Sequence, residues 1–124
     1  MRASEMYLIE AEGLARAGQI GQAQEVLFDF VSHRDPGYVK STKTGDAFID
    51  EVYFQRRIEL WGEGFSYVDH KRLKKGIVRD YTGTNHNVDA RINLDAGASA
   101  FKFRIPDAEI NENKGIPASE NNPI

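Results

Sequence analysis

The sequence of 124 residues contains no cysteine, which excludes disulfide bonds, thiol catalysis and thiolate metal sites. It has no apolar run long enough to cross a membrane, and no signal peptide opens it. Positive charge is not in excess, because the formal net charge is −3 and no basic run alternates with aromatic residues. Nothing therefore predicts a nucleic-acid partner. The absence of cysteine does not fix the cellular compartment.

The remaining composition is that of an ordinary globular protein, with 40% hydrophobic and 28% charged residues. The length corresponds to one domain with a core of its own. A helical pattern is already under way at residue 2, in the run RASEMYLIEAEGLARAG. We therefore expect a fragment of a longer protein, whose targeting signal would lie upstream.

Apolar periodicity predicts four helices, over about 3–17, 20–34, 46–62 and 65–75. The first two would form an antiparallel pair joined near Gly18. This pair resembles one tetratricopeptide repeat, because aromatic, small and large side chains fall at the packing positions of that repeat: Tyr7, Ala11, Leu14, Ala23 and Leu27. One repeat cannot bury its own face, so further helices must cover it. The sequence predicts an all-α protein.

The third predicted helix carries two apolar stripes. One contains Ile49, Val52, Tyr53 and Leu60, and the opposite one contains Phe54, Ile58 and Trp61. A helix that is apolar on two sides should have neighbours on both. Arg56 falls inside the first stripe, and a buried charge must be paired.

Charged side chains are concentrated on this helix and the next one. Two interpretations exist for Glu59 and Glu63, which are four residues apart: structural ion pairs or a paired-carboxylate active site. Nearby arginines would keep both carboxylates ionised and unsuited to general acid catalysis, so we favour the structural interpretation. The expected ion-pair network contains Arg56, Arg57, Glu59, Glu63, Asp69 and Arg72.

No periodicity marks residues 77–100, which we expect to be irregular. Asn85, Asn87 and Asp89 alternate like the start of a calcium loop. Ala90 stands where that loop needs glycine, and Ala96 stands where it needs a bidentate glutamate. We therefore expect no bound calcium, and the rest of the sequence predicts no other cofactor.

The last segment combines apolar alternation with many asparagines. Residues 101–105 alternate as a short strand would, and Pro106 ends the pattern. We expect the rest of the tail to be non-helical. We also expect residues 101–124 to pack on the helical body, because the tail has apolar side chains to bury: Phe101, Phe103, Ile105 and Ile110.

Two blocks of sequence resemble the C-terminal region of the SusD/RagB family. The central block is Gln55-Arg56-Arg57-Ile58-Glu59-Leu60, followed by Glu63-Gly64, Tyr67, Asp69 and Arg72. The tail block is Phe103-Arg104-Ile105-Pro106-Asp107-Ala108-Glu109-Ile110, then Asn113 and Asn121-Asn122-Pro123. Tyr7-Leu8 with Glu10-Ala11-Glu12 is similar to the opening of a family helix. Ser66, Val68 and His70 depart from the pattern.

The resemblance implies a SusD-like superhelix of tetratricopeptide-like helix pairs, of which residues 1–124 would be the C-terminal portion of one domain. It further implies an outer-membrane surface lipoprotein, attached only through an upstream lipid anchor that this chain lacks. Such a protein captures oligosaccharide without cleaving it and delivers it to a SusC-like TonB-dependent transporter. The motif residues would then be scaffold.

Sugar binding needs flat aromatic faces beside amide and hydroxyl groups. One loop has this chemistry, with Tyr81, Asn85, His86 and Asn87, and Tyr38 is a second candidate face. The alternative function is a tetratricopeptide-type protein-interaction module without a small ligand. An enzyme is not expected, because the sequence has no serine-centred motif and no metal cluster.

Overall fold

Residues 2–121 are described by a computed structural model, in which the chain divides into two compact units, one ending at Ser66 and the other beginning at Tyr67. The described residues contain five α-helices and two strands of two residues each. The predicted all-α fold class is confirmed. Asn122 and Pro123, at the end of the family-like tail, lie outside the described residues.

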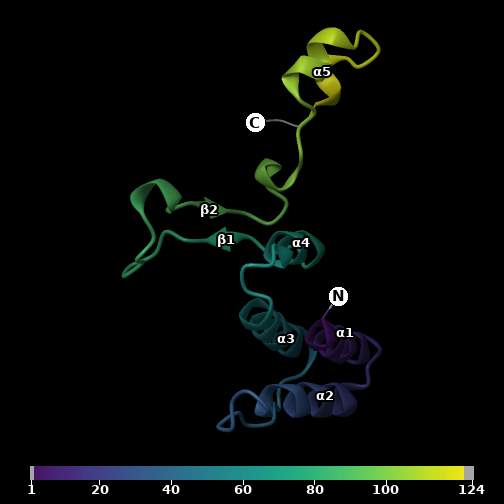
Figure 1. Ribbon diagram of the computed structural model, residues 1–124, viewed down its shortest axis with the longest axis vertical. Coiled ribbons are helices and arrows are strands. Elements are labelled where there is room, and N and C mark those ends of the chain that lie inside the picture. Colours follow the sequence, from purple (N-terminus) through teal and green to yellow (C-terminus); the bar gives the residue numbers. More distant parts are fainter. Residues whose placement is uncertain (1, 122–124) are drawn as a thin grey trace. The chain divides into compact units, whose positions relative to one another are not determined.

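Three helices form the first unit: α1 (Ala3–Arg16), α2 (Ile20–Ser32) and α3 (Gly45–Glu59). α1 and α2 make a hairpin, and α3 packs against α1 (Figure 1). α1 is therefore the helix that contacts both of the others. The predicted helices lie at these positions, but the second and third end two and three residues earlier than the periodicity indicated.

The ends of these helices follow from local chemistry. Gly18 has a φ of +80°, which a residue with a side chain rarely adopts, and it lets the chain reverse between α1 and α2. The N–H of Gln19 donates to the carbonyl oxygen of Leu14 at 2.9 Å within this turn. Beyond α2, Pro36 disfavours the helical conformation of Asp35, so the helix cannot continue.

The core of the first unit is made by side chains at helical spacing. Its buried cluster contains Leu8, Ala11, Ala23, Leu27, Val31, Phe48 and Val52. Ala11 and Ala23 are completely buried, and such small side chains let helices approach closely. Each of the large members contributes about 1.5–3 kcal/mol by its burial.

The second apolar stripe of α3 behaves differently from the prediction. Phe54, Ile58 and Trp61 are 56%, 58% and 85% exposed. The side chains of the first stripe are buried in the core of the first unit. Those of the second stripe remain largely exposed to solvent among the described residues. The expectation that α3 has neighbours on both sides is therefore wrong for this structure. The helix that lies between two others is α1.

An ion pair joins α3 to α1 inside the packed region. The Arg56 Nη2 atom lies 3.0 Å from Glu5 Oε1, and the two side chains are only 8% and 13% exposed. The Arg56 guanidinium also lies 5.2 Å from the centre of the Phe65 ring. Arg56 thus enters an apolar stripe with an anionic and an aromatic partner, as a buried cation requires.

The other predicted network members have separate partners. Glu59 pairs with Arg34 at 2.7 Å, and Glu63 pairs with Arg2 at 3.0 Å. Glu59 and Glu63 therefore take their cations from outside the predicted set. Arg57 is exposed, forms no ion pair within residues 2–121, and lies 5.7 Å from the Tyr53 ring.

The second unit begins within α4 (Phe65–Arg72) and continues through β1 (Ile77–Val78) and β2 (Asn93–Leu94) to α5 (Asp107–Glu112). Short 3-10 turns occupy Val88–Ala90, Ser99–Phe101 and Ala118–Glu120. Asp69 is 2% exposed, and its carboxylate pairs with Arg72 Nε at 2.6 Å. Two members of the predicted network, Asp69 and Arg72, therefore pair with each other within α4.

β1 and β2 form an antiparallel pair in a region that was predicted to be irregular throughout (Figure 1). Ile77 opposes Leu94, and Val78 opposes Asn93. Strands of two residues are too short to give a period, which explains why the sequence did not reveal them. At Gly76 a Cβ atom would lie 2.3 Å from the carbonyl oxygen of Leu94, so the approach of the two segments requires glycine here.

The tail corrects two predictions. Residues 101–105 form no strand; the backbone N–H and C=O of Ile105 instead bind the side-chain amide of Asn121, at 2.9 and 3.0 Å. The tail is also not wholly non-helical, because α5 follows Pro106 directly. Asp107 and Glu109 lie in the first turn of α5, where they suit the helix dipole. Six residues are too few for periodicity to show.

Phe101 is the one aromatic of this tail that is fully buried among the described residues, at 4% exposure. Its ring lies near those of Tyr67 and His70, and the Tyr67 hydroxyl donates to the carbonyl oxygen of Phe101 at 2.8 Å. Phe103 is 79% exposed, so its expected burial is wrong. The start of the tail is thus held on α4 by Phe101.

We predict that Arg56→Ala lowers the free energy of unfolding by about 3 kcal/mol or more, because it strands the largely buried carboxylate of Glu5. Chemical denaturation of the two proteins measures this. Arg57→Ala is the matched control, since Arg57 is the next residue of the same helix but is exposed. A loss in Arg56→Ala no larger than in the control would contradict the prediction.

Candidate functional site

The four loop residues predicted to contact sugar lie together between β1 and β2. Tyr81 is 53% exposed, and Asn85, His86 and Asn87 are exposed as well. The structure therefore brings an aromatic face, two amides and an imidazole onto one accessible loop.

Hydrogen bonds within this loop give it a defined path. The Thr84 hydroxyl donates to the Arg79 carbonyl oxygen at 2.9 Å, and the Thr84 N–H donates to the Tyr81 carbonyl oxygen at 3.1 Å. Asn93 closes the loop, because its side-chain oxygen accepts the N–H groups of Arg79 and Asp80, both at 3.1 Å. Tyr81 is thus presented by a turn that side chains stabilise.

Tyr38 belongs to the first unit, and its side chain is only partly exposed. Its ring stacks on Phe28, with ring centres 6.3 Å apart, and its hydroxyl donates to Glu51 Oε1 at 2.6 Å. Ser41 lies in the same loop, between α2 and α3, and is buried; its hydroxyl donates to Glu51 Oε2 at 2.6 Å.

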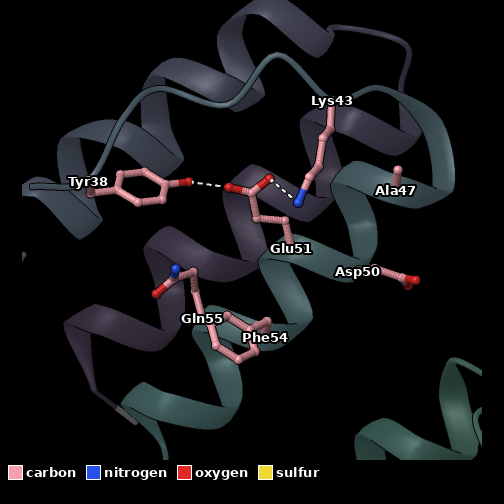
Figure 2. A pocket seen from close by; sticks show the side chains of 7 residues that line it. All are labelled: Tyr38, Lys43, Ala47, Asp50, Glu51, Phe54 and Gln55. Atoms are coloured by element: carbon pink, nitrogen blue, oxygen red, sulfur yellow. Dashed lines mark hydrogen bonds and ion pairs between the residues drawn. The ribbon is translucent and has the colours of Figure 1, made fainter.

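A pocket of about 360 Å³ opens beside this loop, and we call it the α3 pocket (Figure 2). The residues that line it are Tyr38, Lys43, Ala47, Asp50, Glu51, Phe54 and Gln55. The last five lie on α3 at spacings of three and four residues, which places them along one face of the helix. The sequence analysis missed this pocket. Its one signal was the second apolar stripe, to which Phe54 belongs.

Glu51 is the electrostatic centre of the α3 pocket. Besides Tyr38 and Ser41, Lys43 reaches its Oε2 atom, with Nζ at 3.3 Å (Figure 2). Burial alone would raise the pKa of Glu51, but the hydrogen bonds from Ser41, Tyr38 and Lys43 and the positive charge of Lys43 hold that pKa below its usual range. Burial, the hydrogen bond to Glu51 and the negative charge of Glu51 raise the pKa of Tyr38. The pair therefore combines an ionised carboxylate with a neutral phenol.

This arrangement suits binding better than catalysis. Three donors engage the Glu51 carboxylate, so it is a poor proton donor and a fixed anchor for the loop. In Figure 2 the ring of Phe54 and the amide of Gln55 are both on the side of the pocket away from Lys43. In residues 2–121, no group of three or more acidic or imidazole side chains is placed to hold a metal ion.

A helix hairpin is the repeated unit of tetratricopeptide-like helical proteins, and in the first unit a third helix packs on such a hairpin. The chain belongs to the SusD family, whose sequence model matches residues 1–123. The resemblance seen in the central helix and in the tail is confirmed.

A solved structure has the same fold. It is the crystal structure of a SusD-like carbohydrate binding protein from Bacteroides vulgatus, with a TM-score of 0.74 and 24% sequence identity. The similarity covers 100% of the present chain and 30% of the matched chain. The present chain therefore spans about a third of the length of that relative. A search of curated proteins found no match.

We predict that Glu51→Gln lowers the melting temperature at neutral pH, and that the difference from the wild type shrinks below about pH 4.5. Because the folded-state pKa of Glu51 is below its ordinary value of 4.5, the ionised group stabilises the fold. That contribution is complete above the ordinary pKa and is lost as the pH falls through the folded-state pKa.

Thermal unfolding from about pH 7 down to about pH 3 measures this effect across the titration of the carboxylates. Glu10→Gln, which neutralises an exposed carboxylate on α1, controls for the loss of one charge. A melting-temperature difference for Glu51→Gln that stays constant over the whole range would refute the prediction.

Proposed function

We propose that the protein captures oligosaccharide at the cell surface without cleaving it, and that it passes the glycan to a SusC-like TonB-dependent transporter. The observation that carries this proposal is the family match over residues 1–123. The similar solved structure is that of a SusD-like carbohydrate binding protein, which supports glycan as the ligand class. The exposed loop with Tyr81 adds chemistry suited to sugar.

The proposed location is the outer membrane, on the outside of the cell. Residues 1–124 would be the C-terminal portion of one SusD-like domain, and a lipidated cysteine upstream would anchor the whole protein. Among the helices in residues 2–121, none has both the length and the apolar character that a bilayer span needs. In this proposal the lipid anchor alone provides the membrane contact.

The absence of hydrolysis is part of the proposal. Glu59 and Glu63 are the carboxylates whose spacing raised the possibility of an active site. Each is paired with an arginine of its own, Arg34 and Arg2 respectively. A glycosidase needs one carboxyl group with a raised pKa beside one that stays ionised. Glu59 and Glu63 instead have the same kind of partner, so their surroundings do not differ as those of a catalytic pair do, and they suit a structural role.

We expect the intact parent protein to bind an oligosaccharide with a Kd in the micromolar to millimolar range, which corresponds to roughly 4–8 kcal/mol. Tyr81→Ala should weaken binding about tenfold, because the loop loses its flat face. Isothermal titration against a glycan panel measures both values. Val39→Ala is the control, since Val39 is 80% exposed and lies outside the loop.

Two results would count against this proposal in different ways. Release of reducing ends from any glycan would refute the non-catalytic function. Unchanged affinity in Tyr81→Ala, with binding intact, would exclude the β1–β2 loop and leave the function standing.

A tetratricopeptide-type interaction module is the second candidate, and the exposed apolar stripe of α3 favours it. Trp61, which follows the end of α3, is 85% exposed, and an open aromatic side chain of this size is typical of a protein contact. This function predicts that a peptide or protein ligand loses affinity in Trp61→Ala while no glycan in the panel binds. Glycan binding that is unaffected by Trp61→Ala would contradict it.

A further inference from the structure

We propose that Phe103, Tyr67 and Lys71 form a subsite for an anionic sugar residue of the bound glycan, one that carries a carboxylate or a sulfate. This inference rests on the proposed function and adds to it a class of ligand. The subsite belongs to the second unit and is made of residues outside the loop between β1 and β2. Three observations carry it: an open aromatic ring, a fixed neighbour for that ring, and an ammonium without a carboxylate partner.

Phe103 supplies the apolar surface. Phe101, two residues earlier, is buried and holds the start of the tail on α4, whereas Phe103 is 79% exposed. The anchoring of the tail therefore leaves the Phe103 ring largely open. A pyranose has one face made of C–H groups, which packs on an aromatic ring as other apolar surfaces do. The ring thus offers a stacking face to a sugar.

Tyr67 of α4 holds this ring in place. The centres of the Tyr67 and Phe103 rings are 5.6 Å apart, and the ring planes are inclined at 46°. Tyr67 is itself fixed, because its hydroxyl donates to the carbonyl oxygen of Phe101 at 2.8 Å and its ring lies 6.2 Å from the Phe101 ring. An aromatic face that is positioned before binding loses little conformational entropy when a ligand stacks on it.

Lys71 supplies the charge. It follows Tyr67 by four residues, which places the two side chains on the same face of α4. Its Nζ atom lies 5.6 Å from the centre of the Tyr67 ring and 5.9 Å from the centre of the Phe103 ring. Within residues 2–121, the Lys71 side chain forms no ion pair and no hydrogen bond. Its three N–H donors are therefore available to an anion that lies beside the rings.

The carboxylates closest to the subsite along the chain already have cationic partners. Residues 70–75 and 101–104 contain no acidic residue. Asp69 precedes the first segment, is 2% exposed and pairs with Arg72 at 2.6 Å. Asp107 follows the second segment and pairs with Arg104 at 3.6 Å. Neither carboxylate is paired with the Lys71 ammonium.

Two further lysines add positive charge to the same two segments. Lys74 and Lys102 are exposed, and the described part of the chain gives neither of them an ion pair. Charges that are separated by less than about 10 Å still interact at ordinary ionic strength. A carboxylate or sulfate that enters beside Phe103 would therefore gain a charge-assisted hydrogen bond from Lys71 in a positive surrounding. A neutral sugar would gain only the stacking and neutral hydrogen bonds.

The test uses the intact parent protein with uronate-containing and sulfated oligosaccharides. Each is compared with a neutral counterpart that differs in the anion alone, which is the carboxyl-reduced or the desulfated form of the same oligosaccharide. Isothermal titration gives the affinities, and thermal unfolding reports the integrity of each variant. We expect at least one acidic oligosaccharide to bind about fivefold more tightly than its counterpart, by a factor that shrinks at high salt.

Substitutions of Lys71 test the charge directly. Lys71→Met keeps an unbranched side chain beside the two rings but removes the ammonium, so the acidic and neutral forms should bind equally. Lys71→Arg keeps the charge and should keep the preference. Lys114→Met is the control, because Lys114 is another exposed lysine without an ion pair in residues 2–121 and lies on neither segment of the subsite. It should leave the preference unchanged.

Phe103→Leu separates stacking from packing. It keeps apolar bulk but removes the flat ring, so it should weaken binding of the acidic oligosaccharide about fivefold. The melting temperature should stay near that of the wild type, because the side chain is 79% exposed.

Each contrary outcome has a distinct meaning. Equal affinity for every acidic oligosaccharide and its neutral counterpart, or a preference that persists in Lys71→Met, overturns the subsite and leaves the proposed function intact. Unchanged affinity in Phe103→Leu, with a lowered melting temperature, overturns the subsite in favour of polypeptide packing on Phe103. Failure of every glycan, acidic or neutral, to bind the wild-type protein overturns the proposed function and the subsite together.

Discussion

The close packing of α1 against both α2 and α3 is the constraint on which the first unit depends. It requires small side chains, and Ala11 and Ala23 are completely buried. It also requires that any charge inside the packed region be neutralised. Arg56 of α3 meets Glu5 of α1 there, so the same contact that buries the apolar stripe also positions an ion pair. The contact between α1 and α3 therefore requires close packing and charge pairing at the same time.

Other buried or partly buried carboxylates also have a cationic partner. Glu12 pairs with Arg16, Glu59 with Arg34, and Asp69 with Arg72. Glu51 differs, because it gathers a phenol, a hydroxyl and an ammonium from the α2–α3 loop. An anion that recruits three groups from one segment imposes a conformation on that segment. The α3 pocket exists because this loop is held open beside the helix.

The sequence predicted what repeats at a fixed period and what belongs to a family pattern. Helices of 13 to 15 residues show several turns of apolar spacing, so α1, α2 and α3 were located within a few residues. β1, β2 and α5 are too short to show a period. The α3 pocket could not be predicted, because Tyr38 and Lys43 reach Glu51 only after the loop has folded back on α3. Spacing along the chain does not encode that approach.

Family residues and pocket residues occupy different halves of α3 and share one member, Gln55. Arg56 and Glu59, in the C-terminal half, are engaged in ion pairs that hold α1 and Arg34. Ala47, Asp50 and Phe54, in the N-terminal half, line the pocket and are not part of the family pattern. A substitution at Phe54 removes little buried surface, because the side chain is 56% exposed. The outer face of α3 can therefore change its side chains while the ion-paired half keeps the fold.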